Sequence, residues 1–359
     1  MVTKIDDAEA IDFLERLVRI YSPSFQERPV AEYIVQAMGR WGYQQAEIDA
    51  AGNAVGFLGE GKQRILLLGH IDTVPGYIPV RREGSLLYGR GTVDAKGPFA
   101  AFVVAAARAA QRANLQIIVV GAVEEEAASS AGAYYIVNHL TPTDYVIIGE
   151  PSSWQRITIS YKGRLLIDYA LERPLAHTAG QQRGVCEEAV DFWLRIRNLA
   201  QSYNQDKERQ SQTLDPSLRS ICSSNDGLRE RVEMTIGLRL PLGFEASQLT
   251  SHLAEWKQEA QVSTRGYELP FRAPKRNALT SAFLAAIRAE GAKPAFVSKT
   301  GTSDMNVIGP RWKRPIVAYG PGDSSLDHTP EEHLDLEEYL AAIRVLERVL
   351  ERLGKKSSS

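Results

Sequence analysis

His70 and Asp72 stand two residues apart at the end of the apolar run Ile65–Leu68, and Asp94 follows further along the chain. In a β-strand, residues two apart point to the same side, so the Asp72 carboxylate could hold one imidazole nitrogen of His70. A histidine oriented in this way keeps its other ring nitrogen for a metal ion. Taken alone, the pair favours an ordinary interpretation, in which His70 is a hydrogen-bonded core histidine and Asp94 caps a helix.

Further acidic and histidine residues follow apolar stretches elsewhere in the chain. A glutamate run, Glu124–Glu126, comes directly after the stretch 116–123, Glu150 follows the stretch 145–148, and His328 lies in a Gly-Pro loop. Open α/β sheets gather their sites at the carboxyl ends of strands, so we expect these side chains to meet. An isolated glutamate run is usually a solvated turn, but this one follows a strand that should point into the crevice.

These residue types suit a centre with two metal ions. Two histidines together with several carboxylates favour a borderline metal such as Zn²⁺, Co²⁺ or Mn²⁺. Five ligands are too many for one tetrahedral ion that keeps an open position, and they fit two ions about 3.5–4 Å apart that share a bridging carboxylate. A spare glutamate beside a ligating glutamate could take the proton of an attacking water.

The elements that must position these residues follow two patterns. In the first, each apolar strand leads through an acidic residue or a histidine into a helix, which is typical of a doubly wound α/β sheet. Helical spacing and apolar runs predict helices at 7–20, 28–41, 95–110 and 129–139, and strands at 54–58, 64–69, 116–123 and 145–148.

The second pattern begins near residue 163 and lacks long buried runs. It predicts strands at 165–171, 231–240 and 261–267, helices at 184–200 and 246–258, and a stretch of low order at 202–225. The first pattern then resumes, with helices at 278–289 and 335–352 and strands at 295–298 and 315–319. We therefore expect an α/β catalytic domain, residues 1–162 and 271–359, interrupted by a smaller α+β domain, residues 163–270.

Composition excludes several classes of protein. The chain has 359 residues, 44% of them hydrophobic, and a formal net charge of −2, so nothing draws it to nucleic acid or anionic membrane. Two cysteines are too few for a disulfide framework. The N-terminal residues lack the apolar run of a signal peptide, and no apolar stretch is long enough to span a bilayer. We expect a cytoplasmic protein with no nucleic-acid or membrane partner.

Seven short motifs stand in one order along the chain, GHIDTVP, GRGTVDAKG, VEEE…SSAGA, IIGEPS, AHTAGQQRG, TGTSDMN and GPG…DHTPEEH. This ordered set resembles the M20 family of co-catalytic zinc aminoacylases and peptidases, and it spans nearly the whole chain. The resemblance implies a doubly wound, zinc-peptidase-like catalytic domain with an inserted four-stranded α+β lid. It also implies a homodimer formed through that lid, and two bound divalent metals, with Zn²⁺ preferred over Co²⁺ or Mn²⁺.

The resemblance assigns roles to individual residues. One metal would be held by His70, Asp94 and Glu150, and the other by the bridging Asp94, Glu126 and His328. Asp72 would be the partner of His70, and the Asp94–Ala95 peptide bond would be cis. His177, in the lid, would reach the active site of the partner subunit and polarise the scissile carbonyl.

The register of the glutamate run leaves two assignments open. Counting back from Gly132 favours Glu125 as the catalytic base and Glu126 as the ligand, whereas counting from the strand end makes Glu124 the base and Glu125 the ligand. Ser303 and Asp304 could grip the amino-acid end of the substrate. Their alternative role is an ordinary helix cap.

Within the family, the chain length, the short lid, KTGTSDMN and EEE…SSAGA most resemble the branch that acts on LysW. Such enzymes hydrolyse the amide between lysine or ornithine and the γ-carboxyl of the C-terminal glutamate of this small acidic amino-group carrier protein. Basic residues that could meet the carrier are Arg164, Arg183, Lys275 and Arg276. A small-molecule deacylase of the acetylornithine or succinyl-diaminopimelate type, or a dipeptidase, is the alternative. A non-catalytic protein should lack a ligand or the base, and none is missing.

Overall fold

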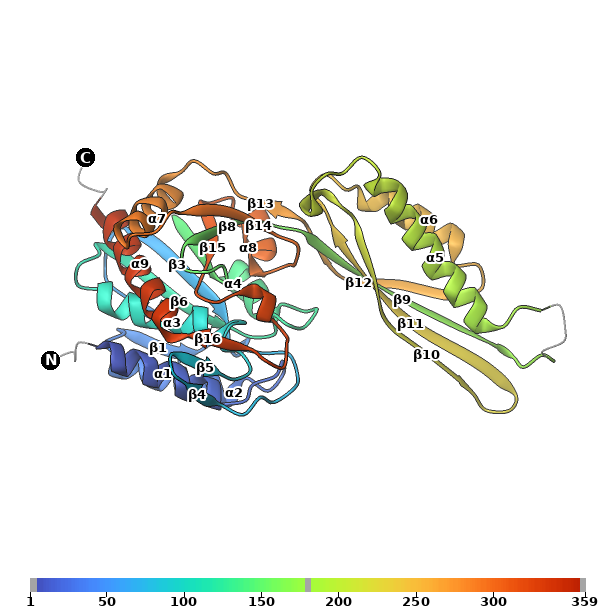
Figure 1. The fold of residues 1–359 in the computed structure, drawn as a ribbon, viewed down its shortest axis with the longest axis horizontal. Coiled ribbons are helices and arrows are strands. Elements are labelled where there is room, and N and C mark those ends of the chain that lie inside the picture. The colour runs from blue at the N-terminus through green and yellow to red at the C-terminus, as the bar shows by residue number, and fades with distance from the viewer. Residues whose placement is uncertain (1–4, 178–181, 356–359) are drawn as a thin grey trace. The chain divides into compact units, whose positions relative to one another are not determined.

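The computed structural model describes residues 5–177 and 182–355, shown as a ribbon in Figure 1. The chain forms two compact units. Unit 1 comprises Met1–Ser160, Ala273–Ser298 and Ser303–Ser359, and unit 2 comprises Tyr161–Arg272 and Lys299–Thr302. Unit 2 therefore differs from the expected insert, residues 163–270, mainly by the segment Lys299–Thr302. One reason is that Arg239 of unit 2 donates a hydrogen bond to the Thr302 hydroxyl at 2.9 Å.

Unit 1 is built on a mixed sheet whose strands lie in the order β1-β2-β6-β3-β7-β15-β8, with β14 also paired to β8. The central strands β3, β6, β7 and β15 are parallel, and β1, β2 and β8 pair antiparallel with their neighbours. Their bounds are β1 Gln45–Ile48, β2 Ala54–Leu58, β3 Gln63–His70, β6 Leu115–Ala122, β7 Tyr145–Gly149, β8 Arg156–Tyr161, β14 Ala295–Lys299 and β15 Ile316–Tyr319.

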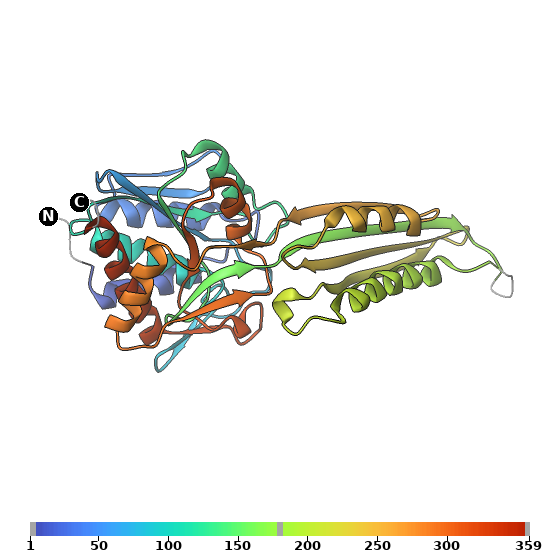
Figure 2. The ribbon, with the colours of Figure 1, turned by 90° about the horizontal axis from the view of Figure 1, so that it is seen from above.

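Helices cover both faces of this sheet, as the expected doubly wound fold requires. Figure 2 shows α4 and α8 on one face and α3, α7 and α9 on the other. Parallel strands buried on both faces must be apolar throughout, which explains the unbroken apolar runs of β3, β6 and β7. The helices are α1 Asp7–Arg19, α2 Arg28–Arg40, α3 Lys96–Ala109, α4 Ala131–His139, α7 Ala278–Ala289, α8 Asp304–Trp312 and α9 Leu336–Lys355.

A small antiparallel sheet and one missed helix complete unit 1. The small sheet has the order β16-β5-β4, formed by β4 Arg81–Glu83, β5 Leu86–Tyr88 and β16 His333–Asp335. Helix α8 was not among the predicted helices, although a helix cap was the alternative role given to Ser303 and Asp304. It begins directly after Ser303, whose side chain accepts a hydrogen bond from the Met305 N–H. The peptide bond between Asp94 and Ala95 is cis, as the resemblance implied.

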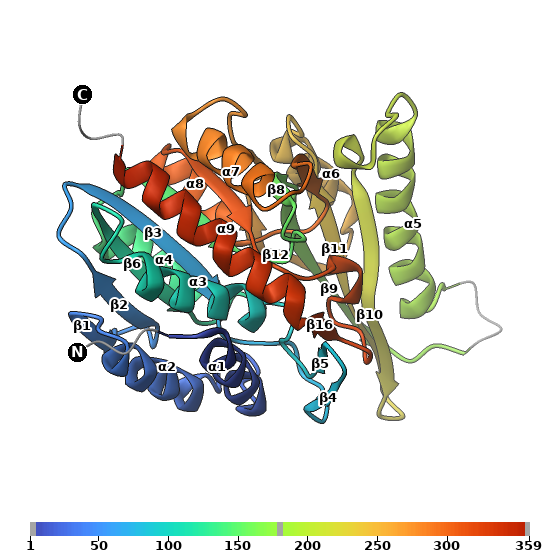
Figure 3. The same cartoon turned by 60° about the vertical axis from the view of Figure 1, so that its left-hand side comes forward.

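Unit 2 is a four-stranded antiparallel sheet in the order β10-β11-β9-β12. Two helices pack on one of its faces around a core that includes Tyr169, Phe192 and Met234, and Figure 3 shows both helices beside the sheet. The elements are β9 Gly163–Pro174, α5 Val185–Asn204, η1 Gln210–Gln212, β10 Asp215–Asn225, β11 Arg229–Leu240, α6 Ala246–Trp256 and β12 Gln261–Glu268, followed by the short β13 Phe271–Arg272.

The low order expected at 202–225 is wrong. Helix α5 continues to Asn204, and β10 runs from Asp215 to Asn225, with one irregularity in its pairing with β11 between Leu218 and Ser220. Strand β10 lies at the edge of its sheet with nearly every residue exposed, so it carries no buried apolar face to reveal it in the sequence. In the part of the chain that the structure describes, no helix is long and apolar enough to cross a membrane.

Candidate active site

The carboxyl ends of three neighbouring parallel strands bring the predicted residues together. Strand β3 pairs with β6 in a register that sets His70 opposite Ala122, and with β7 in a register that sets Gly69 opposite Gly149. The residues that follow these strands therefore emerge at one edge of the sheet. They include the glutamate run after β6 and Glu150 after β7.

His70 is buried and held at both ring nitrogens. Its Nε2 lies 3.1 Å from Asp94 Oδ1, and its Nδ1 lies 3.0 Å from the backbone oxygen and 3.4 Å from the carboxylate of Asp72. Burial alone would lower the pKa of His70, but the contacts with Asp72 and Asp94 raise it well above its usual value. Nε2 is thus the nitrogen that faces the acidic cluster.

The strand argument for His70 and Asp72 was incorrect, although the two residues do meet. Strand β3 ends at His70, so the alternation of a strand does not extend to Asp72. The Asp72 carboxylate instead accepts hydrogen bonds from the N–H groups of Glu125 and Glu126, at 3.1 and 3.0 Å, and from the Ser24 hydroxyl at 2.7 Å. Asp72 therefore fixes the backbone of the glutamate run as well as His70.

His328 faces the same cluster from the loop after β15. Its Nε2 lies 3.0 Å from Asp94 Oδ2 and 2.9 Å from Glu126 Oε1. These contacts raise the pKa of His328 to about 10. Burial would raise the pKa of Asp94, but hydrogen bonds from His328 and His70 lower it, so Asp94 lies between two histidines.

Three overlapping groups of these side chains have ligand atoms within 4.8 Å of one another. Two of the groups share Asp94, as a bridging carboxylate would require, and they contain only imidazole nitrogens and carboxylate oxygens. Burial raises the pKa values of Glu125, Glu126 and Glu150, and the charges of neighbouring carboxylates raise them further. The donor set thus fits divalent metal ions of the Zn²⁺ type. The groups are His70–Asp94–Glu150, Asp94–Glu126–His328 and His70–Glu125–Glu126.

The three glutamates of the run have different surroundings. Glu124 has a left-handed backbone with φ 61°, and its carboxylate accepts a hydrogen bond from the Ser129 hydroxyl at 2.6 Å. Burial raises the pKa of Glu125 well above its usual value, and the charges of Glu150 and Asp304 raise it further. The side chain of Glu126 is 10% exposed and contacts His328.

Glu332, which sequence reasoning missed, holds the loop that carries Asp94. Its side chain is 1% exposed and accepts hydrogen bonds from the N–H groups of Gly91, Val93 and Asp94 at 2.9 to 3.2 Å. It also pairs with Arg90 at 2.9 Å. The signal available was the acidic end of the motif DHTPEEH, four residues after His328.

The two residues expected to bind substrate begin helix α8. Ser303 is the N-cap, so its hydroxyl already has the capping role that the sequence left as an alternative. Asp304 is 2% exposed, and its charge acts on both Glu125 and Glu150. Asp304 therefore lies beside the cluster, and contact of either residue with substrate stays a prediction.

The expected residues of unit 2 are described within that unit. His177 is exposed, three residues after β9 ends, and the rest of its motif, residues 178–181, lies outside the described residues. Arg164 pairs with Glu268 at 2.5 Å, and Arg183 pairs with Asp191 at 2.6 Å.

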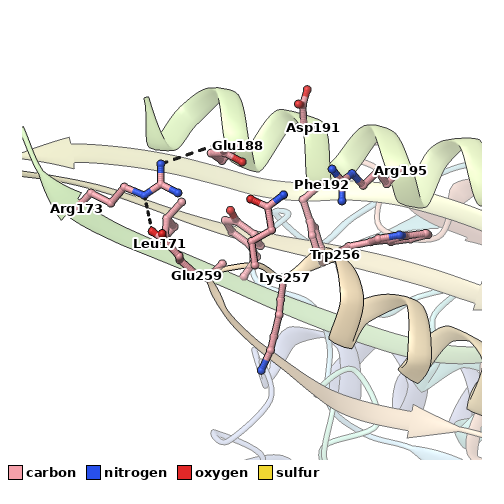
Figure 4. Close-up of a pocket in the computed structure, with 12 residues that line it drawn as sticks. Leu171, Arg173, Glu188, Asp191, Phe192, Arg195, Trp256, Lys257 and Glu259 are labelled. Carbon is pink, nitrogen blue, oxygen red and sulfur yellow. Dashed lines mark hydrogen bonds and ion pairs between the residues drawn. The ribbon is translucent and has the colours of Figure 1, made fainter. Parts of the chain in front are cut away.

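A separate cavity in unit 2 is too small for a substrate. It lies beside α5 and the end of α6 and has a volume of about 10 Å³, roughly enough for one water molecule. Figure 4 shows that charged side chains line it, and Arg173 there pairs with Glu259 at 3.0 Å and with Glu188 at 3.9 Å. The cavity therefore gives no candidate for the substrate site.

Residues 66–352 match the Peptidase family M20/M25/M40, and the chain belongs to this family. It is 42% identical to the LysW-lysine hydrolase of Deinococcus radiodurans, over 98% of this chain and 99% of that protein.

Solved structures of the family have the same fold. A metallo-carboxypeptidase of Sulfolobus solfataricus is 16% identical, with a TM-score of 0.78 over 97% of this chain and 99% of that one. A dinuclear metal-binding M20 peptidase of Bacillus subtilis is 13% identical, with a TM-score of 0.66 over 97% of this chain and 98% of that one.

Proposed function

We propose that this chain is a dimetal amidohydrolase that releases lysine, or ornithine, from the γ-carboxyl of the C-terminal glutamate of a LysW-type amino-group carrier protein. The observation that supports this substrate is the 42% identity, over nearly the full length of both chains, to a LysW-lysine hydrolase. The role belongs to lysine or arginine biosynthesis, for which we propose a cytoplasmic location.

We assign one metal to His70, Asp94 and Glu150 and the other to Asp94, Glu126 and His328, with Asp94 as the bridge. The proximity of the ligand atoms in these two groups supports the assignment. Zn²⁺ is the metal we propose, and Co²⁺ or Mn²⁺ would fit the same donors. When bound, such ions polarise a carbonyl oxygen and acidify water.

We assign the catalytic base to Glu125 rather than Glu124. Glu125 lies in the cluster beside His70 and its backbone N–H donates to Asp72, whereas the Glu124 carboxylate accepts a hydrogen bond from Ser129. Glu125 would take a proton from the attacking water and return it to the leaving amine. The alternative register, with Glu124 as base and Glu125 as ligand, leaves Glu126 without a function although it contacts His328.

The proposal extends to a homodimer formed through unit 2. In it, His177 of one subunit would polarise the scissile carbonyl in the active site of the other. The exposure of His177 is compatible with that role. A hydrogen-bond donor to a developing oxyanion is worth about 3 kcal/mol, so the His177→Ala variant should lose activity about a hundredfold or more.

The decisive experiment measures release of free amino acid from a carrier protein charged with lysine or with ornithine, by mass spectrometry, after reconstitution with Zn²⁺ or Co²⁺. Nα-acetylornithine and N-succinyl-diaminopimelate serve as small competitors. Fast release from the carrier alone supports the proposal. Release only from a small acyl amino acid would mean that the substrate is a small molecule and not the carrier. No turnover of any of these substrates with two metals bound would mean that the protein is not an enzyme of this kind.

A further inference from the structure

The exposed large hydrophobic side chains of unit 1 gather beside the candidate active site. Among the described residues of that unit, Tyr21, Phe25 and Tyr77 are 37%, 72% and 63% exposed. The first two lie on the loop between α1 and α2, and Tyr77 lies on the loop that follows β3. We call these three side chains the aromatic rim.

The loops of the aromatic rim are bound to each other and to the glutamate run. The N–H of Thr73 donates to the Ser22 carbonyl and the N–H of Ser24 donates to the Thr73 carbonyl, at 3.0 and 3.2 Å. The Ser24 hydroxyl then donates to Asp72, whose carboxylate holds the N–H of Glu125. The Asp72 side chain thus links Ser24, which precedes Phe25, to the backbone N–H of Glu125, the proposed base.

Two of the rim side chains are held by contacts, and the third lies on a constrained backbone. The Tyr21 hydroxyl accepts a hydrogen bond from the Gly76 N–H at 3.0 Å, and the Tyr21 and Tyr77 rings meet edge to face with centroids 5.9 Å apart. Phe25 is fixed in a left-handed backbone conformation at φ 74°, which a bulky residue rarely adopts. Rigid exposed aromatics are typical of protein–protein contacts, because they offer a large contact area at little entropic cost.

We infer that the aromatic rim is the docking surface for the body of the carrier protein. This inference rests on the proposed function. His70 and Glu150 are buried and Glu125 is only partly exposed, so a charged carrier would insert its final glutamate with the attached amino acid, and its folded part would cover the surface around the opening. A small acyl amino acid would leave that surface exposed to water.

The charge of the neighbouring segment fits an acidic partner. The chain that leaves Tyr77 continues into β4, where Arg81 and Arg82 are exposed. Arg81 pairs with Glu83 and also lies over the Tyr88 ring, while Arg82 donates to the carbonyl of Gly84. These guanidinium groups would strengthen the binding of an acidic carrier at low salt, and this contribution would decrease as the salt concentration rises.

The test compares two substrates in the metal-reconstituted enzyme. One is the carrier charged with lysine, and the other is N-acetyl-glutamate joined through its γ-carboxyl to lysine, which reproduces only the last residue of the carrier. Phe25→Gly removes the aromatic ring at a position whose φ suits glycine, so it should not impair folding. Tyr77→Ala tests the second loop, and Phe25→Tyr and Tyr77→Phe are the matched controls that keep an aromatic ring.

We expect Phe25→Gly and Tyr77→Ala each to raise KM for the charged carrier about tenfold or more, with kcat nearly unchanged. The ratio of KM for the carrier to KM for the minimal substrate should rise by the same factor, and the controls should restore it. Wild-type KM for the carrier in both variants would overturn the docking surface and leave the proposed function intact. Release by the wild type from the minimal substrate alone would overturn both.

Discussion

At the scale of single residues, the glutamate run offers the sharpest test of the mechanism. Glu125→Gln keeps the shape of the side chain but removes the proton acceptor, so we expect activity to fall by about a thousandfold while two metal ions remain bound. Glu124→Gln is the matched control and should stay within tenfold of the wild type. Metal content and initial rates are measured on the same samples of both variants. A larger loss of activity in Glu124→Gln than in Glu125→Gln would mean that the assignment of the base is wrong.

Glu332 should act by positioning the Asp94 loop. Glu332→Gln leaves the buried Arg90 without a carboxylate and weakens the acceptor of three backbone N–H groups, so we expect a loss of about 3 kcal/mol in unfolding free energy. We also expect metal affinity to fall about tenfold or more, because partners that orient ligands have effects of that size.

The neighbouring Glu331 is exposed and provides the control for Glu332. Glu331→Gln should change the unfolding free energy by no more than about 0.5 kcal/mol. Urea unfolding and competition with a zinc chelator measure the two effects. Equal stability and equal metal affinity in both variants would show that Glu332 does not position the loop.

Sequence patterns identified the residues of the cluster, but not all of the contacts that organise it. His70, the glutamate run and Glu150 could be placed because each ends or follows a strand buried on both faces, whose apolar run marks where the strand ends. The two roles of Asp72 could not be predicted, since they depend on how the backbone turns after β3 and β6. Glu332 was missed because three of its partners are backbone N–H groups and its charged partner, Arg90, lies far from it in the sequence.

At the scale of elements, a helix or strand could be predicted where its buried residues recur regularly along the sequence. Helix α9 was found because it carries a regular apolar stripe. Strand β10 was missed because it is an exposed polar edge, and α8 was missed because Pro310 lies inside it and it is short. A long element with a repeating buried face is visible in the sequence, whereas an exposed edge strand is not, and neither is a short helix such as α8 that is buried on most sides.

The junction of α7 and α9 should make stability depend on pH. Glu290, at the end of α7, accepts hydrogen bonds from Arg344 and Arg348 of α9 at 3.0 and 2.6 Å. Burial would raise the pKa of Glu290, but these arginines lower it. A lowered folded-state pKa gives stability that is present above the unfolded value of about 4.3 and is lost as the pH falls through the folded value.

We therefore expect Glu290→Gln to cost about 1 kcal/mol of unfolding free energy at pH 7. The difference from the wild type should shrink as the pH falls below about 4, where the wild-type carboxyl takes up its proton. Urea unfolding of both proteins at a series of pH values tests this expectation. A difference that is constant with pH would mean that the ion pairs with α9 contribute nothing.

At the scale of the whole molecule, the clustered carboxylates should couple metal binding to the stability of unit 1. A ligand that binds only the folded state stabilises it by mass action, by about 2.7 kcal/mol at a hundred times its dissociation constant. We expect chelation to abolish activity and to lower the midpoint of thermal unfolding, and two equivalents of Zn²⁺ to restore both. Ca²⁺, which prefers oxygen ligands, should restore neither. A thermal unfolding midpoint that does not change on chelation or on addition of Zn²⁺ would contradict the assignment of the cluster as a metal site.

Because the ribosome makes the chain from its N-terminus, the residues that hold Asp94 are not all made at the same time. Asp94 is synthesised early, but His328 and Glu332, which contact its side chain and its loop, are added more than two hundred residues later. Unit 2 is almost one continuous stretch and is finished before them. A nascent chain that stops before residue 328 therefore cannot complete the group Asp94–Glu126–His328, and its Asp94 loop lacks the buried carboxylate that holds it.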